Sequence, residues 1–175
     1  MKRAFLIIVL IALIGPNASI SQYTTAEQRL FAAGYLLLKK SNELSFIGSD
    51  LAQFMKKFKN IDKLDELQRC YIRSLIENIA LAEIICKHVS ILLGALAYIE
   101  NDHKSEQYKV YDNHLKEDTL KRLYLSYQNT GSINTSLEEK EILYFADKAK
   151  NEMLMATKLI EEVIEILQSK GKAKE

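Results

Sequence analysis

Residues that interrupt helices are scarce in this chain. Of its 175 residues one is proline, Pro16, six are glycine, and tryptophan is absent. Proline and glycine are the strongest local breakers of helices. A chain without proline after position 16 therefore favours long, uninterrupted helices.

Cysteine is also scarce, which limits the disulfide bonds that can form. Cys70 and Cys86 are the only two, and both fall in a segment whose periodicity predicts one continuous helix. Their separation along such a helix is about 24 Å, whereas a disulfide needs Cα atoms within about 7 Å. The sequence therefore predicts two buried thiols, with an intermolecular bridge through one of them as the alternative.

Charge of one sign does not dominate either. The chain has 24 basic and 23 acidic side chains, and removal of Lys2 and Arg3 with a leader leaves 22 and 23, a formal charge of −1. Nucleic acids and anionic membrane surfaces attract strongly basic proteins. The balance argues against either as the main partner.

The amino terminus has the layout of a secretory signal peptide. Two basic residues precede an apolar run from Ala4 to Ile14, which ends at Gly15-Pro16. Ser19 and Ser21 fit the small positions before a cleavage site, so residues 1–21 are the predicted leader and Gln22 the first mature residue. As a helix the run rises only about 16 Å, against roughly 30 Å of hydrocarbon. We expect export to the periplasm or the exterior, with membrane contact only through the leader, rather than an uncleaved anchor.

Apolar residues recur at alternating spacings of three and four through the rest of the chain. The recurrence predicts four helices over approximately residues 24–58, 63–99, 105–128 and 136–169. Polar segments separate them, and 129–134 has the strongest loop composition. Together these patterns predict an all-α fold, an elongated antiparallel four-helix bundle of residues 22–175 preceded by the signal peptide.

The predicted helices differ in their starts and faces. Thr24 with Glu27, and Thr25 with Gln28, both have the spacing of a capping box at the first start. From Ile79 onward the second helix is apolar on several faces, which predicts the most buried of the four. In the third helix the apolar stripe shifts phase between Leu115 and Leu120.

Small residues alternate with leucines along the first predicted helix. Gly34, Ser41 and Gly48 recur every seven residues, each four residues after a leucine. Small side chains let a neighbouring helix approach closely, although each glycine costs about 1 kcal/mol of helix propensity. We therefore predict a close helix-packing seam that faces either the second helix or a second copy of the chain.

Patterns that carry catalysis or bind metals are incomplete. A di-iron bundle needs two Glu-x-x-His motifs, and the chain has one, Glu100 to His103, in a predicted loop. Cys86 and His88 diverge by about 200° on a helix, and both are predicted to be core residues. The nucleophile elbow, the phosphate-binding glycine loop and the zinc-protease motif are absent. The sequence predicts no enzyme activity, no metal site and no cofactor.

Tyrosine is the one enrichment that indicates a binding surface. Tyr108 and Tyr111 open the third predicted helix, and Tyr124 and Tyr127 close it. Each pair has the i, i+3 spacing that makes side chains neighbours on a helix. Because tyrosine combines an apolar ring with a polar tip, these four residues are the candidate partner interface. The alternative is that the rings pack one end of the bundle.

The segment Ser136–Tyr144 combines a serine-led, acidic helix start with a tyrosine ahead of a long amphipathic helix. This pattern resembles exported helical proteins of conjugative type IV secretion systems. Members of that family are thought to be minor pilus or transfer-channel accessories without enzymatic activity, so the resemblance implies an envelope-assembly accessory. The resemblance is confined to the last part of the chain. The chain as a whole lacks the long mid-protein extension that many members of the family carry.

Three hypotheses for function follow. The first is an exported, non-enzymatic helical interaction protein of the cell envelope or extracellular space, which binds a protein partner or itself through helical faces. The second is an accessory of a conjugative type IV secretion system. The third is a carrier of small apolar ligands, with a cavity inside the bundle between the first two helices.

Overall fold

The computed structural model describes residues 20, 25–58, 64–96, 104–134 and 140–171. Within those ranges the secondary structure is helical, without strands, which confirms the predicted all-α class. The helices are α2 (Ala26–Lys57), α3 (Glu66–Leu96), α4 (Lys104–His114), η4 (Leu115–Leu120), α5 (Lys121–Asn134) and α6 (Lys140–Gly171). The predicted signal peptide lies outside the described residues except for Ile20, whose side chain is buried.

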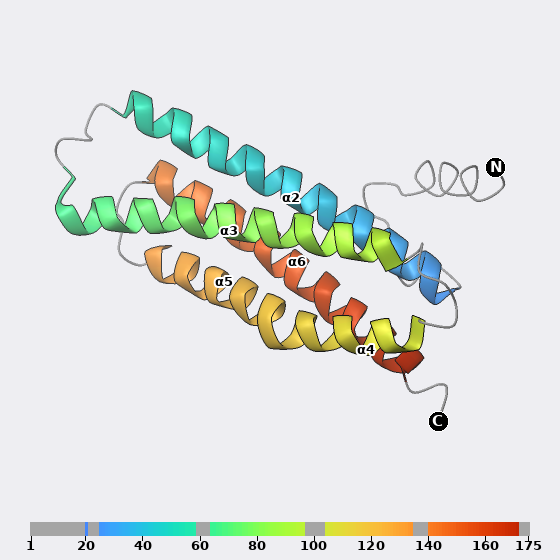
Figure 1. Ribbon diagram of the computed structural model, residues 1–175. Helices are drawn as coiled ribbons and strands as arrows, with labels where there is room; N and C mark the ends of the chain where they lie inside the picture. Colours follow the sequence, from blue (N-terminus) through green and yellow to red (C-terminus); the bar gives the residue numbers. More distant parts are fainter. Residues whose placement is uncertain (1–19, 21–24, 59–63, 97–103, 135–139, 172–175) are drawn as a thin grey trace.

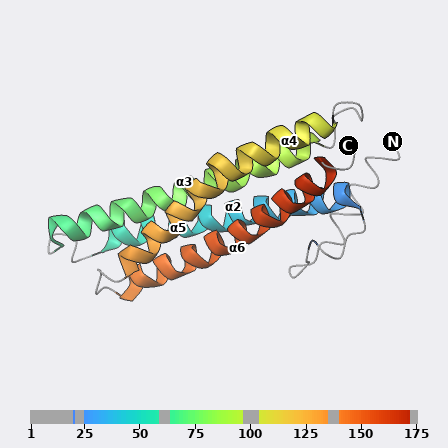
Figure 2. The ribbon, with the colours of Figure 1, turned by 90° about the horizontal axis from the view of Figure 1, so that it is seen from below.

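The helices form four long rods that lie side by side (Figure 1), since α4, η4 and α5 continue one another as a third rod. Consecutive rods run in opposite directions, and the view from below shows the same arrangement (Figure 2). α3 packs mainly against α2 and α5, whereas α6 packs against α2, α4 and α5. α3 and α6 therefore lie diagonally across from one another.

Side chains of the first turn cap both α2 and α3. In α2, the backbone N–H of Gln28 donates to Thr25 Oγ1 at 3.2 Å, and the Thr25 N–H donates to Gln28 Oε1 at 3.3 Å, which is one of the two predicted capping boxes. The same reciprocal pair joins Asp65 and Gln68 at 2.7 and 3.0 Å. This second box starts α3 at Glu66, later than the predicted start near residue 63.

The third rod differs from its prediction at two places. Leu115–Leu120 forms a π-helical turn, which has an i→i+5 repeat and so absorbs the phase shift of the apolar stripe. The loop predicted at 129–134 is wrong, because α5 continues to Asn134. Thr130 is fully buried there and donates its hydroxyl to the sulfur of Met153 at 3.8 Å. Packing against α6 thus outweighs the loop propensity of the local sequence.

The core lies between the four rods and follows the predicted spacing of three and four. α6 contributes its whole predicted seam from Ile142 to Leu167. α2 and α3 contribute the fully buried Leu37, Leu44, Leu51, Leu75 and Ile79, and the third rod and α6 add Leu115, Leu123, Ile142, Ile160 and Leu167. Burial of a leucine or isoleucine is worth about 2 kcal/mol, so these rows account for much of the stability of the fold.

Candidate functional site

α3 has two apolar faces, and only one of them is covered. The inner seam consists of Leu75, Ala82, Val89 and Leu96, which are at most 3% exposed. On the opposite side Leu81 is 37% exposed, and Ile84 and Ile91 are each 63% exposed. We define the outer face of α3 as these three residues and their exposed neighbours, namely Glu77, Ala80, Lys87, His88 and Ala95.

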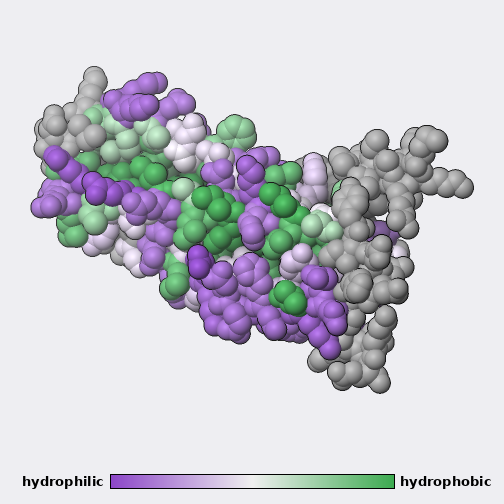
Figure 3. Space-filling model, in the orientation of Figure 1, coloured by the Kyte–Doolittle hydropathy of each residue, from purple (hydrophilic) through white to green (hydrophobic). Residues whose placement is uncertain are grey.

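The outer face contradicts the prediction that this helix is the most buried of the four. Its residues 77, 81, 84, 88, 91 and 95 repeat the spacing of three and four that is typical of a helix-packing seam. Figure 3 shows hydrophobic residues gathered over the course of α3, with hydrophilic residues to either side. Apart from the contact of His88 with His114 of α4, this second seam is exposed among the described residues.

The length and composition of α3 are those of a helix that can cross a membrane. The most apolar 18 residues of Glu66–Leu96 have a mean hydropathy of 1.9, and 39% of them are buried. More than half of this stretch is therefore not buried by the described chain. Glu83, Lys87 and His88 lie within it, and charged groups are expensive inside a bilayer.

Charge is distributed unevenly along the outer face. The acidic end is Glu77, and the basic end is Lys87 and His88, with Leu81 and Ile84 between them. Among the described residues, neither Glu77 nor Lys87 belongs to an ion pair. The imidazole of His88 meets that of His114 edge to face, with ring centroids 5.8 Å apart.

The predicted small-residue seam of α2 lies against α3 of the same chain. A Cβ atom at Gly34 would be 3.4 Å from Leu93 Cβ, and one at Gly48 would be 3.3 Å from Ile79 Cγ2. Ser41, between the two glycines, is 2% exposed. The close approach of α2 and α3 therefore occupies this seam within the chain, and it is not a free surface for a partner.

The four predicted interface tyrosines do not form one surface. Tyr108 is buried in the core, and burial raises the pKa of its hydroxyl. Tyr111 and Tyr127 are half-buried, whereas Tyr124 is exposed. The rings of Tyr124 and Tyr127 stack with centroids 6.2 Å apart, and Lys150 Nζ lies 5.8 Å from the Tyr127 ring. Only the α5 pair thus has an exposed member.

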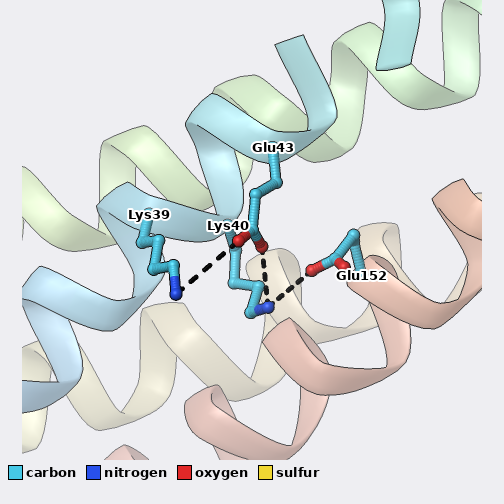
Figure 4. Close-up of polar contacts among 4 residues, drawn as sticks. All are labelled: Lys39, Lys40, Glu43 and Glu152. Carbon is cyan, nitrogen blue, oxygen red and sulfur yellow. Dashed lines mark hydrogen bonds and ion pairs between the residues drawn. The ribbon is translucent and has the colours of Figure 1, made fainter. Parts of the chain in front are cut away.

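A cluster of charges joins α2 to α6 (Figure 4). Lys40 Nζ donates to Glu43 Oε2 at 2.7 Å and to Glu152 Oε2 at 2.6 Å, and Lys39 Nζ lies 3.8 Å from Glu43 Oε1. The Lys40 and Glu152 side chains are only 14% and 18% exposed. The spacing of Lys40 and Glu43 fits an i, i+3 pair, but nothing in the sequence indicates that Glu152 completes it.

In this cluster, burial and ion pairing shift the pKa values of Lys40 and Glu152 in opposite directions. Burial alone would lower the pKa of Lys40, but its hydrogen bonds to Glu152 and Glu43 raise the value above its usual range. Burial raises the pKa of Glu152, and the neighbouring Glu43 adds to that shift. The two carboxylates are therefore held together by one ammonium group, which is a structural role.

The cysteines and His88 lie differently from their prediction. Cys86 is buried as expected, and burial raises the pKa of its thiol to about 12, so the thiol is protonated at neutral pH and a poor nucleophile. Cys70 and His88 were both predicted to be buried and are exposed. Because both cysteines belong to the single helix α3, they do not pair with one another.

Metal-binding groupings are absent from the described residues. Within those ranges there is no group of three or more histidine, cysteine, aspartate or glutamate side chains placed to hold an ion. The single Glu-x-x-His match, Glu100 and His103, lies outside them.

An open groove lies where α2 ends and α3 begins. Its volume is about 550 Å³, and apolar side chains of Met55, Leu64 and Ile76 line it together with Arg69 and Arg73. Arg69 Nε donates to the Leu64 carbonyl at 3.1 Å, which holds the start of α3. The groove opens at the end of the rods, not inside the core.

Comparisons with known proteins supply no identity. No family model, no curated protein sequence and no solved structure matches this chain. The resemblance of Ser136–Tyr144 to transfer-system accessories stays a prediction, and the structure describes only Lys140–Tyr144 of that segment.

Proposed function

We propose that this protein is a non-enzymatic interaction protein that binds a helical protein partner through the outer face of α3. In this proposal the chain is synthesised with a signal peptide, is exported, and folds as an antiparallel four-helix bundle. The observation that carries the proposal is the exposure of Ile84 and Ile91, each 63%, on a helix whose opposite face is fully buried. Exposed apolar patches of this kind mark binding surfaces in soluble proteins.

The geometry of the outer face favours a helix as the bound element. Its alternation of three and four residues is the pattern that accepts side chains of a second helix between its own. A helix laid into such a stripe is anchored at positions i, i+3, i+4 and i+7. On the outer face, Leu81, Ile84, His88 and Ile91 follow the same alternation, at positions i, i+3, i+7 and i+10.

The candidate groups for catalysis support the non-enzymatic part of the proposal. The Cys86 thiol is buried and protonated, and His88 contacts His114 instead of Cys86. Lys40 is bound between two carboxylates. The Cys86 thiol and the Lys40 ammonium are therefore not placed to act as a nucleophile or base on an external substrate.

Site-specific photo-crosslinking tests the interaction surface. A photoreactive phenylalanine analogue replaces Ile84 in one variant and Met155, 49% exposed on the diagonal helix α6, in a second. In the cells that make the protein, irradiation should give a defined adduct at position 84 and none at 155, with the partner peptide identified by mass spectrometry. Equal adducts at both positions, or none at either, would contradict the proposal.

The mass of the exported protein tests the localisation. Cleavage after Ser21 gives a chain that begins at Gln22 and is found outside the cytoplasm. The same measurement decides whether Ile20, whose side chain is buried, belongs to the functional protein. Recovery of a cytoplasmic chain that still begins at Met1 would contradict export.

The groove between α2 and α3 favours a second candidate function, the carriage of a small apolar ligand. Its volume of about 550 Å³ is in the range of small-molecule sites, and its lining is mostly apolar. Native mass spectrometry of freshly purified protein should then show a retained ligand, and Ile76→Asp should release it. A wild-type mass equal to that of the bare chain would contradict carriage.

A further inference from the structure

We infer that the helix bound by the outer face of α3 is α3 of a second copy, in an antiparallel, two-fold symmetric pair centred on Leu81 and Ile84. The inference rests on the proposed function and names its partner. Leu81 at 37% and Ile84 at 63% exposure are the apolar centre of the face. In the pair, Ile84 of each copy packs against the partner's Leu81.

The charges at the two ends of the face select this direction. Glu77 lies before the apolar centre, and Lys87 and His88 lie after it. With Ile84 opposite the partner's Leu81, an antiparallel pair sets Glu77 opposite the partner's His88 and beside the partner's Lys87. Two-fold symmetry repeats this contact at the other end. A parallel pair would instead set Glu77 against the partner's Glu77, and like charges would repel.

Two further charged groups near the centre of the helix, Arg73 and Glu83, are compatible with the pair. Arg73 lies beyond Glu77 and would meet the partner's 91–95 stretch, Ile-Leu-Leu-Gly-Ala, which has no charge. Glu83 is half-buried and lies about 100° around the helix from Ile84, so it points away from the contact. The face is therefore complementary to itself in apolar surface and in charge.

Oligomeric state tests the apolar part of the inference. Sedimentation velocity of the protein purified from the expressing cells should show twice the chain mass at micromolar concentration. Ile84→Glu should weaken the dimer by about 100-fold or more, because it buries an unpaired charge at the centre of the contact. Met155→Glu, at another exposed apolar site on α6, should leave the dimer unchanged, and circular dichroism checks that both variants keep their helices.

Charge reversal tests the register. Glu77→Lys and Lys87→Glu should each weaken the dimer roughly tenfold, and the double variant should recover most of that loss. Non-specific apolar association would respond to Ile84→Glu but not to compensation between positions 77 and 87. Two single reversals whose effects add in the double variant would overturn the antiparallel pair.

Failure of this inference is distinguishable from failure of the proposed function. A wild-type monomer at all concentrations, with a photo-adduct at position 84 to a different protein, overturns self-association and leaves the proposed function standing. A monomer without any protein adduct at position 84 overturns both. Flotation with lipid vesicles that Ile84→Glu abolishes would assign the outer face to a membrane and would also overturn both.

Discussion

The inner and outer faces of α3 have similar side chains and opposite surroundings. The inner seam, with Leu75 and Val89, is sealed by the other rods, whereas Ile84 and Ile91 on the outer face are mostly exposed. Both faces have the same spacing along one helix. The pattern of apolar residues therefore predicts that a face will be covered, but not by which chain. We propose that a partner covers the outer face, which the described residues of this chain leave exposed.

Truncation of one aliphatic side chain on each face should give the largest contrast in stability. Leu75→Ala leaves a cavity in the core and should lower the free energy of unfolding by about 3 kcal/mol. Ile84→Ala removes exposed surface and should change it by less than about 0.5 kcal/mol in the monomer. Urea unfolding at submicromolar concentration measures both. Equal losses would mean that the outer face is packed within the chain.

Two lysines of the charged cluster, Lys40 and Lys39, give a second comparison between a covered and an exposed side chain. Lys40→Met leaves Glu43 and Glu152 without their shared cation and should cost about 2 kcal/mol. Lys39→Met removes a side chain that is 40% exposed and lies 3.8 Å from Glu43, and it should cost less than about 0.5 kcal/mol. Thermal unfolding of the two variants compares them directly, and similar losses would contradict a structural role for Lys40.

The loss caused by Lys40→Met should depend on pH. Without the ammonium group, burial and the neighbouring Glu43 raise the pKa of Glu152 unopposed, so the folded state binds this proton more tightly than the unfolded state, and the variant loses stability as pH rises above the ordinary value of 4.5. In the wild type, the contribution of Lys40 persists until pH rises through its raised pKa, above the ordinary 10.5. The difference between the two proteins should therefore be small at pH 3 and largest near neutrality. A difference that stays constant with pH would contradict this assignment.

Gly94 and Gly48 differ in the space that each leaves for one added methyl group. A Cβ at Gly94 would have no atom within 4 Å, whereas one at Gly48 would be 3.3 Å from Ile79 Cγ2. Gly94→Ala should therefore raise the free energy of unfolding by about 1 kcal/mol through helix propensity. Gly48→Ala should gain less, because the Ile79 methyl must move. An equal gain at both positions would show that α2 and α3 are not closely packed.

The last comparison concerns the reactivity of the two cysteine thiols and involves no change in stability. Maleimide should label Cys70, which is exposed, and leave Cys86 unlabelled in the folded protein, since that thiol is buried with a pKa of about 12. Mass spectrometry after limited reaction counts and locates the label. Labelling of Cys86 at the rate of Cys70 would mean that the α3 core opens readily.

Periodicity and capping chemistry predicted most of the helical architecture. The Thr25 cap, the α6 seam and the phase shift in the third rod are each visible as residue spacings, and each has a structural counterpart. These features depend on residues within a few turns of one another, where helix geometry alone relates sequence to contact.

Features that depend on distant segments were not predictable in the same way. The predicted end of the third rod was wrong, because burial of Thr130 against α6 outweighs the loop propensity of the surrounding sequence. Glu152 lies 112 residues from its partner Lys40, beyond any local pattern. The outer face of α3 does have a visible spacing at residues 77, 81, 84, 88, 91 and 95. A sequence cannot distinguish a seam covered by its own chain from one covered by another.

Accessibility of position 84 in the natural setting tests the central claim most directly. In a Cys70→Ser background, the variant Ile84→Cys places a single exposed thiol at the centre of the outer face, because Cys86 is buried. Maleimide should react rapidly with this thiol in dilute purified protein and at least roughly tenfold more slowly in intact cells, where the partner covers it. Labelling at the same rate in both settings would show that the face stays open to water and would contradict the account.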